Sequence, residues 1–379
     1  MKGGEGAEVF AAWLEEAAGL ARGSLYEGKG WVAPNPMVGA LAIERGEVVG
    51  RGLHRVYGGP HAEEEALRAA ARAGAHPDTL VVTLEPCSST GPGKKRPPCT
   101  ETILGSHVQR VVVGLEDPDP RHQGRGLDLL RERGIAVHGP FSSPALQELL
   151  GPFRKACALD RPWVIAKWAM SMDGKTATRT GSSAWISGER ALDFGHRLRA
   201  SCDGVLVGYR TALLDRPRLT VRRVQGSSPQ RVVLDPRLEL PLDSPLFRTE
   251  EAPTWVFHLE GQGGEKRAEL EDRGVRCLSL PALVPGGRVP DLTQGLRLLR
   301  AEGLRRLLVE GGGRTLAQLL KQDCVDQCLA LVSPKLVGGE DAPTPLGGEG
   351  VVEIDQALVL AQSYSYALER DLLMGGFLL

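Results

Sequence analysis

Three residues of types that bind zinc occur in the first third of the chain, each in a distinctive local pattern. His61 opens His61-Ala62-Glu63, Cys87 follows Pro86, and Cys99 follows Pro97-Pro98. One imidazole and two thiolates leave a tetrahedral zinc one ligand short, and zinc lowers the pKa of a water in the open position toward neutrality. Because a structural zinc normally has four protein ligands, the sequence predicts one catalytic Zn²⁺ per chain.

A carboxylate lies close to the first of these ligands. Glu63 follows His61 by two residues, which suits it to take a proton from the zinc-activated water and pass it to a departing amine. This pattern is typical of zinc nucleobase deaminases, although eleven residues separate Cys87 from Cys99 here and two do in the usual motif. We therefore expect Glu63 to be the catalytic acid and base of a hydrolytic deamination.

The elements around the ligands support this interpretation. A short apolar run at 80–84 predicts a buried strand that ends just before Cys87, and Cys99 opens a helical pattern. A helix N-terminus favours the thiolate form of cysteine, which is the form that binds metal. Cys324 and Cys328, four residues apart, could also bind a metal, but no other ligand type is close to them in sequence.

Length and charge indicate a two-domain enzyme of the cytoplasm. The chain has 379 residues, and its 46 basic and 47 acidic side chains nearly cancel. No nucleic-acid or membrane partner is therefore expected. No run of eighteen apolar residues occurs, and the first residues lack a secretory apolar core.

Helical and strand patterns alternate along both halves, which predicts an α/β fold. We expect a first domain at 1–148, a linker at 149–161 and a second domain at 162–379. The first half predicts helices at 9–22, 63–73, 99–106 and 127–133 and strands at 37–45, 79–84 and 108–115, with a connecting helix at 142–150. The second half predicts strands at 163–169, 204–207, 230–234, 254–258 and 306–309 and a helix at 316–320.

The motifs, taken in order, resemble those of the bifunctional deaminase/reductase family of riboflavin biosynthesis. They are Pro34-Asn35-Pro36-Met37-Val38-Gly39, Gly52-Leu53-His54, 58–65, Thr83-Leu84-Glu85-Pro86-Cys87-Ser88, Pro97-Pro98-Cys99, Glu116-Asp117-Pro118-Asp119-Pro120, Ser171-Met172-Asp173-Gly174-Lys175, Thr180-Gly181-Ser182, Trp185-Ile186-Ser187, Pro217-Arg218-Leu219-Thr220, Val309-Glu310-Gly311-Gly312 and Pro334-Lys335-Leu336. The resemblance implies a cytidine-deaminase-like zinc domain followed by a dihydrofolate-reductase-like domain. It also implies deamination of a diaminopyrimidinone ribosylamine 5′-phosphate and then NADPH reduction of its ribosyl chain, by a homo-oligomer.

The resemblance also suggests which residues line the two sites. Contacts to the phosphorylated pyrimidine are expected from Asn35, His54, Lys95, Asp117, Asp119, Lys167, Arg199, Asp215, Leu219, Arg222 and Glu310. Contacts to NADPH are expected from Thr178, Ser182, Trp185, Ser187, Gly311, Gly312 and Gly313. The three glycines stand between a strand and a helix, where backbone N–H groups can approach a pyrophosphate.

The chain departs from the family pattern in two loops. Ser89 stands where the family usually has histidine, the segment 91–94 adds about three residues, and Arg216 replaces the usual asparagine. Two alternatives are therefore considered. One is a single-activity reductase whose zinc domain is mainly a structural module. The other is a nucleic-acid deaminase fused to an unrelated domain, which the balanced charge argues against.

Overall fold

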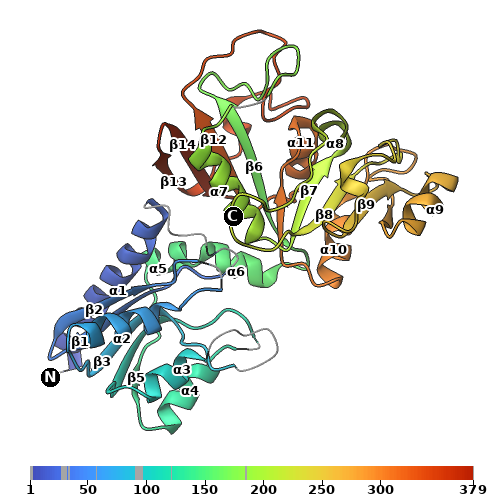
Figure 1. Cartoon of the computed structure of the whole chain (residues 1–379). Coiled ribbons are helices and arrows are strands. Elements are labelled where there is room, and N and C mark those ends of the chain that lie inside the picture. The colour runs from blue at the N-terminus through green and yellow to red at the C-terminus, as the bar shows by residue number, and fades with distance from the viewer. Residues whose placement is uncertain are drawn as a thin grey trace. The chain divides into compact units, whose positions relative to one another are not determined.

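The computed structural model describes residues 3–26, 32, 35–56, 58–89, 97–120, 122–183 and 186–378. The chain divides into two compact units, Met1–Ala158 and Leu159–Leu379 (Figure 1). This division lies inside the segment 149–161 expected to be a linker, although part of that segment, Gly151–Ala158, is helix α6. No helix among the described residues is long and apolar enough to cross a membrane.

The first unit is built on a five-stranded mixed sheet in the order β2-β1-β3-β4-β5. Its strands are β1 (Gly39–Glu44), β2 (Glu47–Leu53), β3 (Thr79–Leu84), β4 (Arg110–Leu115) and β5 (Ala136–His138). The β2-β1-β3 part is antiparallel and the β3-β4-β5 part is parallel. The helices are α1 (Gly3–Tyr26), α2 (Ala62–Arg72), α3 (Cys99–Leu104), α4 (Arg125–Glu132), α5 (Pro144–Leu149) and α6.

Small residues bring α2 close to the sheet and so fix the segment that carries the candidate zinc ligands. Ala62, Ala66 and Ala70 are fully buried at one-turn spacing on α2. They face Gly50 and Gly52 of β2, where a Cβ on Gly52 would lie 1.9 Å from the carbonyl oxygen of Ala62. Any larger side chain at this position would push the start of α2 away from the sheet.

The second unit contains a nine-stranded sheet in the order β10-β9-β8-β7-β11-β6-β12-β14-β13. Its strands are β6 (Trp163–Ser171), β7 (Gly204–Gly208), β8 (Gln230–Leu234), β9 (Thr254–Leu259), β10 (Arg276–Leu280), β11 (Arg306–Val309), β12 (Gln327–Ser333), β13 (Ala361–Leu368) and β14 (Asp371–Phe377). All neighbours are parallel except β12-β14 and β14-β13. The helices are α7 (Glu189–Ala200), α8 (Tyr209–Asp215), α9 (Gly264–Asp272), α10 (Leu292–Ala301) and α11 (Gly313–Lys321), with 3₁₀ turns at Pro245–Phe247 and Ile354–Gln356.

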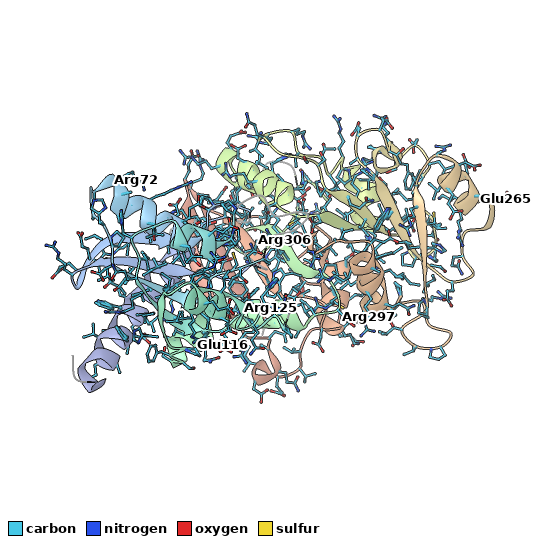
Figure 2. All side chains as sticks on the ribbon, turned by 90° about the horizontal axis from the view of Figure 1, so that it is seen from below. Arg72, Glu116, Arg125, Glu265, Arg297 and Arg306 are labelled. Atoms are coloured by element: carbon cyan, nitrogen blue, oxygen red, sulfur yellow. The ribbon has the colours of Figure 1, made fainter. Side chains whose placement is uncertain are left out.

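Each unit has its own hydrophobic core. One core contains Ala66, Val82 and Ile103 among its members, and the other contains Val164, Phe257 and Leu307. Charged side chains such as Arg72 and Glu265 are exposed on the surface, whereas Arg306 is buried (Figure 2). The α/β class expected from the sequence is confirmed.

The expected elements are present, but several others were not predicted. The strands expected at 79–84, 230–234 and 306–309 match β3, β8 and β11. The helix expected at 9–22 lies within the longer α1, and the connecting helix expected at 142–150 matches α5. The elements without a sequence prediction are β2, β5, α6, α7, α8, α9, β10, α10, β12, β13 and β14.

Candidate active sites

The three predicted zinc ligands come together from three different elements. His61 is the N-cap of α2, Cys87 follows the end of β3, and Cys99 is the first residue of α3. His61 Nδ1 lies 3.1 Å from Cys99 Sγ and 3.7 Å from Cys87 Sγ, and one ligand atom from each residue lies within 4.8 Å of the others. One nitrogen and two sulfur atoms at this spacing fit a tetrahedral Zn²⁺ with a fourth position left for water.

The surroundings favour a thiolate at Cys87. Hydrogen bonding with Cys99 and then with His61 lowers the pKa of Cys87, whereas hydrogen bonding with Cys87 and burial raise the pKa of Cys99. The backbone N–H of Cys99, at the start of α3, also donates to Cys87 Sγ at 3.4 Å. Because the thiolate is the form that binds metal, these contacts prepare the site for zinc.

Glu63 lies in the first turn of α2 and is buried, with 3% of its surface exposed. Burial raises the pKa of its carboxyl group, although the charge of His61 opposes the shift. A carboxyl group whose pKa is raised toward neutrality can both accept and release a proton. The structure therefore places a suitable acid and base two residues from a predicted ligand.

Asn35 and His54 lie beside the predicted zinc ligands. His54 Nδ1 is 2.8 Å from the carbonyl oxygen of Pro60, which can only accept, so Nδ1 carries the proton. His54 Nε2 can then accept from Asn35 Nδ2 at 3.3 Å. Burial lowers the pKa of His54 to about 4, and its ring lies edge-on to that of His61 at 5.1 Å. A neutral His54 is better suited to a pyrimidine edge than to a phosphate.

Asp117 lies just beyond the end of β4, which is parallel to β3, so it emerges at the same sheet edge as the segment leading to Cys87. Its carboxylate accepts the N–H of Asp119 at 2.9 Å, and burial raises the pKa of Asp117. Lys95 lies outside the described residues. Sequence reasoning assigned no role to Glu85, a buried carboxylate that follows β3.

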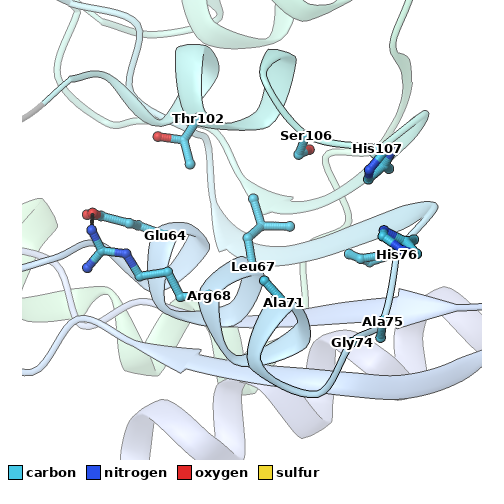
Figure 3. Close-up of a pocket in the computed structure, with 11 residues that line it drawn as sticks. Glu64, Leu67, Arg68, Ala71, Gly74, Ala75, His76, Thr102, Ser106 and His107 are labelled. Atoms are coloured by element: carbon cyan, nitrogen blue, oxygen red, sulfur yellow. Dashed lines mark ion pairs between the residues drawn. The ribbon is translucent and has the colours of Figure 1, made fainter.

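A separate groove of about 480 Å³ lies between α2 and α3 (Figure 3). The Glu64–Arg68 ion pair, at 2.6 Å, lines one part of it, and the rings of His76 and His107 meet edge-on at 4.8 Å in another. Among the residues that the structure describes, none of the predicted zinc, substrate or cofactor residues lines this groove.

In the second unit, the predicted polar residues gather around the end of the central strand β11. Glu310 follows β11, and Arg199 on α7 donates two hydrogen bonds of 2.9 Å to its two carboxylate oxygens. Arg199 also donates to the carbonyl oxygen of Thr220 at 2.8 Å. Burial alone would raise the pKa of Glu310, but Arg199 and Lys167 lower it overall. Lys167, Arg199 and Glu310 therefore form one charged cluster.

The loop after α8 has an unusual backbone. Arg216 and Leu219 have φ angles of 41° and 54°, a left-handed conformation that costs most side chains about 1–2 kcal/mol. Asp215 ends α8, and burial raises the pKa of its carboxyl group. The charges of Arg216 and Arg218 are engaged at the surface, by Asp243 and Glu251, at 3.0 Å each.

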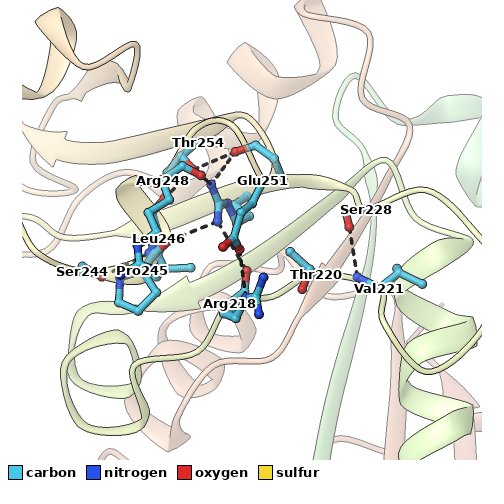
Figure 4. Close-up of polar contacts among 12 residues, drawn as sticks. Arg218, Thr220, Val221, Ser228, Ser244, Pro245, Leu246, Arg248, Glu251 and Thr254 are labelled. Atoms are coloured by element: carbon cyan, nitrogen blue, oxygen red, sulfur yellow. Dashed lines mark hydrogen bonds and ion pairs between the residues drawn. The ribbon is translucent and has the colours of Figure 1, made fainter.

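The buried Arg231 of β8 supports this loop and had no signal in the sequence. Its guanidinium donates to four backbone carbonyl oxygens, at 3.5 Å for Arg218, 3.3 Å for Pro245 and 2.7 Å for Arg248, with the fourth bond to Ala252. Figure 4 shows polar contacts among residues of the segments around 218 and 244–254. Burial lowers the pKa of Arg231.

His196 of α7 lies near the arginines Arg199 and Arg222. Its Nδ1 accepts the backbone N–H of Arg222 at 3.3 Å, which requires that this nitrogen carry no proton. Burial, followed by repulsion from Arg199 and Arg222, lowers the pKa of His196 to about 4. Burial and the neighbouring arginines likewise lower the pKa of Arg222.

The predicted cofactor residues follow the ends of β6 and β11, which are adjacent and parallel. Gly312 is the N-cap of α11 and has no side-chain cap, so first-turn N–H groups of this helix are available to an anion such as pyrophosphate. The glycines also pack closely, since a Cβ on Gly313 would lie 2.9 Å from the carbonyl oxygen of Thr344. These features fit the phosphate end of NADPH.

The other predicted cofactor residues lie in the segment after β6. The Thr178 N–H donates to the carbonyl of Ser182 at 2.9 Å, and the Ser182 N–H donates to Thr178 Oγ1 at 3.1 Å. The Ser187 hydroxyl is buried without a hydrogen-bond partner among the described residues. Trp185 lies outside the described part of the chain.

A His-Cys-Cys cluster with a buried glutamate, on a mixed sheet, defines the first unit as a zinc-dependent deaminase domain. Residues 13–115 match the model of the cytidine and deoxycytidylate deaminase zinc-binding region, and residues 162–373 match that of the RibD C-terminal domain. The chain belongs to the RibD family of riboflavin biosynthesis proteins. It is a bifunctional enzyme, a zinc-dependent deaminase and an NADPH-dependent reductase.

Relatives match both units together. Riboflavin biosynthesis protein RibD of Aquifex aeolicus is 37% identical over 97% of this chain and 98% of its own length. The RibD protein of Synechocystis is 36% identical over 92% of each chain. Among solved structures, RibD of Acinetobacter baumannii is 30% identical, with a TM-score of 0.65 over 98% of this chain and 99% of its own. A diaminohydroxyphosphoribosylaminopyrimidine deaminase/5-amino-6-(5-phosphoribosylamino)uracil reductase of Thermotoga maritima is also 30% identical, with a TM-score of 0.63 over the same shares.

Proposed function

We propose that the first unit removes the amino group of 2,5-diamino-6-ribosylamino-4(3H)-pyrimidinone 5′-phosphate. The observation that carries this proposal is the convergence of His61, Cys87 and Cys99 beside the buried Glu63. Bound zinc supplies Lewis-acid activation of a water at the open position. Glu63 takes the proton of that water and delivers it to the leaving amine, while Asn35 and the neutral His54 orient the ring by hydrogen bonding.

The second unit would then reduce the ribosyl chain of the deaminated product to give 5-amino-6-ribitylaminouracil 5′-phosphate. NADPH supplies the hydride, and the protein positions the sugar and stabilises the charge that develops on its oxygen. Lys167 and Asp215 are the groups we assign to the sugar end, and Arg222 lies in a cationic surrounding suited to the 5′-phosphate. Gly311, Gly312 and Gly313 would hold the cofactor pyrophosphate at the start of α11.

Purified protein incubated with the diaminopyrimidine substrate tests the two activities together. Ammonia release that depends on zinc, without NADPH, is expected from the first unit, and NADPH oxidation is expected to follow only after deamination. Zinc-loaded protein that reduces deaminated substrate but releases no ammonia would establish the single-activity reductase instead. Binding of a transfer RNA hairpin would favour a nucleic-acid deaminase.

The sugar end of the reductase site can be tested by Asp215→Asn. The amide keeps the shape of the side chain but removes its charge, so the reductase rate on deaminated substrate should fall about tenfold or more. NADPH binding and ammonia release should stay as in the unaltered enzyme. Unchanged reductase turnover in both Asp215→Asn and Lys167→Ala would show that the sugar lies elsewhere in this unit.

We further propose that the enzyme works in the cytoplasm as a homo-oligomer, with a phosphorylated small molecule as its substrate. The nearly balanced charge and the absence of a membrane-spanning helix among the described residues agree with this setting.

A further inference from the structure

We propose that Glu85 is a positioning residue of the deaminase site. Its carboxylate would fix the backbone at Asp117, Gly124 and Gly126 and, through Pro86, the approach to Cys87. This inference rests on the zinc site proposed above. Glu85 directly follows β3 and has only 5% of its surface exposed.

The carboxylate of Glu85 accepts three backbone N–H groups from one loop. Oε2 accepts from Asp117 at 3.1 Å and from Gly124 at 2.9 Å, and Oε1 accepts from Gly126 at 2.8 Å. A buried carboxylate that accepts several N–H groups is a strong, charge-assisted anchor. All three donors would lack their partner if this side chain were removed.

Two of these donors, Gly124 and Gly126, belong to the start of α4. The N-cap residue of this helix, Gly124, has a φ of 76° and no side chain that could accept a hydrogen bond from the first turn. The first N–H groups of a helix have no intrahelical acceptor, and a negative charge is favourable there. Glu85, thirty-nine residues away in sequence from Gly124, supplies the missing cap from the end of β3.

The backbone of α4 packs closely against Pro86, the residue before Cys87. A Cβ on Gly126 would lie 2.0 Å from the carbonyl oxygen of Pro86. The Glu85-Pro86 segment therefore contacts the start of α4 twice, through the Glu85 carboxylate and through the Pro86 carbonyl. Cys87 is the next residue, so a movement of α4 would be transmitted directly to a predicted zinc ligand.

The same anchor holds a predicted substrate contact. The Asp117 backbone is bonded to Glu85, and the Asp117 side chain in turn accepts the N–H of Asp119. Glu85 thus connects Cys87, a predicted zinc ligand, with Asp117, a predicted substrate-binding residue. Its carboxylate is saturated by backbone donors, so we assign it no contact with substrate or metal.

The variant Glu85→Gln tests this role, because glutamine has nearly the same volume but presents an NH₂ group to one set of the N–H donors. We expect the KM of deamination to rise at least about tenfold with a smaller change in kcat, because substrate-binding geometry is lost before the acid-base chemistry of Glu63. Hydrogen exchange at the N–H groups of residues 117, 124 and 126 should accelerate. Reductase activity on deaminated substrate should be unaffected.

Two further variants sharpen the test. Glu116→Gln changes the neighbouring carboxylate, which bonds only to the side chain of Gln123 among the described residues, and should leave deamination unchanged. Gly126→Ala should reproduce the rise in KM, because its methyl group would displace α4 from Pro86.

An unaltered protein that lacks zinc-dependent deamination would refute the proposed function. Hydrogen exchange then still decides the anchoring role of Glu85. If Glu85→Gln leaves both the KM and the exchange of residues 117–126 unchanged, Glu85 is not a positioning residue. An equal loss of kcat and of reductase activity, together with general unfolding, would also overturn the proposal, because the side chain would then only support folding.

Discussion

Individual side chains in this enzyme carry unusual protonation behaviour because each is buried beside a specific partner. Glu63 is kept from water by α2 and its pKa is raised, whereas Cys87 is stabilised as a thiolate by Cys99 and His61. A proton acceptor and a metal-binding thiolate can therefore operate in the same small volume.

Glu63→Gln should separate metal binding from proton transfer. The amide preserves the shape of the side chain but cannot carry the proton, so deaminase turnover should fall at least about a hundredfold. Zinc content, measured by atomic absorption, should remain that of the unaltered protein. Surviving activity would mean that a neighbouring group such as Glu64 or Glu65 transfers the proton.

His196 should make the reductase unit less stable in acid. Its folded pKa of about 4 lies below the ordinary value of about 6.5 for histidine, so the unfolded chain binds the extra proton first as pH falls through this window. Stability should therefore fall as the pH is lowered from about 6.5 to about 4. Chemical denaturation of His196→Gln between these pH values should show a shallower loss of stability than the unaltered protein. Exposed His107→Gln is the matched control, and an identical pH dependence in His196→Gln would contradict the assignment.

At the scale of elements, the reductase site depends on strands whose carboxyl ends meet at one edge. β7, β11 and β6 are adjacent and parallel, and the segments that follow them carry Asp215, Glu310 and the predicted cofactor residues. The loop after α8 is strained at Leu219, which has a positive φ angle. The buried Arg231 of β8 holds the backbone of this loop by a hydrogen bond to the carbonyl oxygen of Arg218. The position of the site loop is therefore decided partly by a strand that contributes no predicted site residue.

Arg231→Met should destabilise the second unit without adding a new charge. Four backbone carbonyl oxygens would lose a hydrogen bond in a buried setting, so the free energy of unfolding should fall by at least about 2 kcal/mol. The control variant Arg237→Met removes an exposed ion pair with Glu239. It should change the free energy of unfolding by less than about 0.5 kcal/mol. Equal stability of the two variants in denaturant titrations would contradict this role.

The elements that the sequence predicted are those with a strong local pattern. β3, β8 and β11 each contain a short apolar run, and such a run between turns is typical of a buried strand. β2 was missed because Gly50 and Gly52 interrupt its pattern, although these glycines are what allows α2 to approach. β5 has only three residues, too few for any periodicity to be seen.

At the scale of the whole molecule, the two units have separate cores and separate chemistry. The described cluster of zinc ligands lies entirely in Met1–Ala158, and the predicted NADPH residues lie in Leu159–Leu379. Loss of one site should therefore leave the other unit folded.

Cys99→Ser tests this independence. A hydroxyl is a poor zinc ligand compared with a thiolate, so bound zinc and ammonia release should both be lost. Reduction of already deaminated substrate should remain within about twofold of the unaltered enzyme, because effects at distant sites are largely independent. A Cys99→Ser protein with full deaminase activity and normal zinc content would show that the ligand assignment is wrong.

The sequence alone was enough to predict the zinc-ligand types and the acid-base residue and to identify the family, because these depend on residue identity and short spacing. His61, Glu63, Cys87 and Cys99 could be named before any fold was known. Only the tertiary structure identified Glu85 and Arg231. Their roles depend on backbone groups that lie up to 41 and 21 residues away along the chain, respectively. Hydrogen bonds to backbone atoms leave no trace in the identity of the partner residue, so the motif that contains Glu85 could not show what this side chain bonds to.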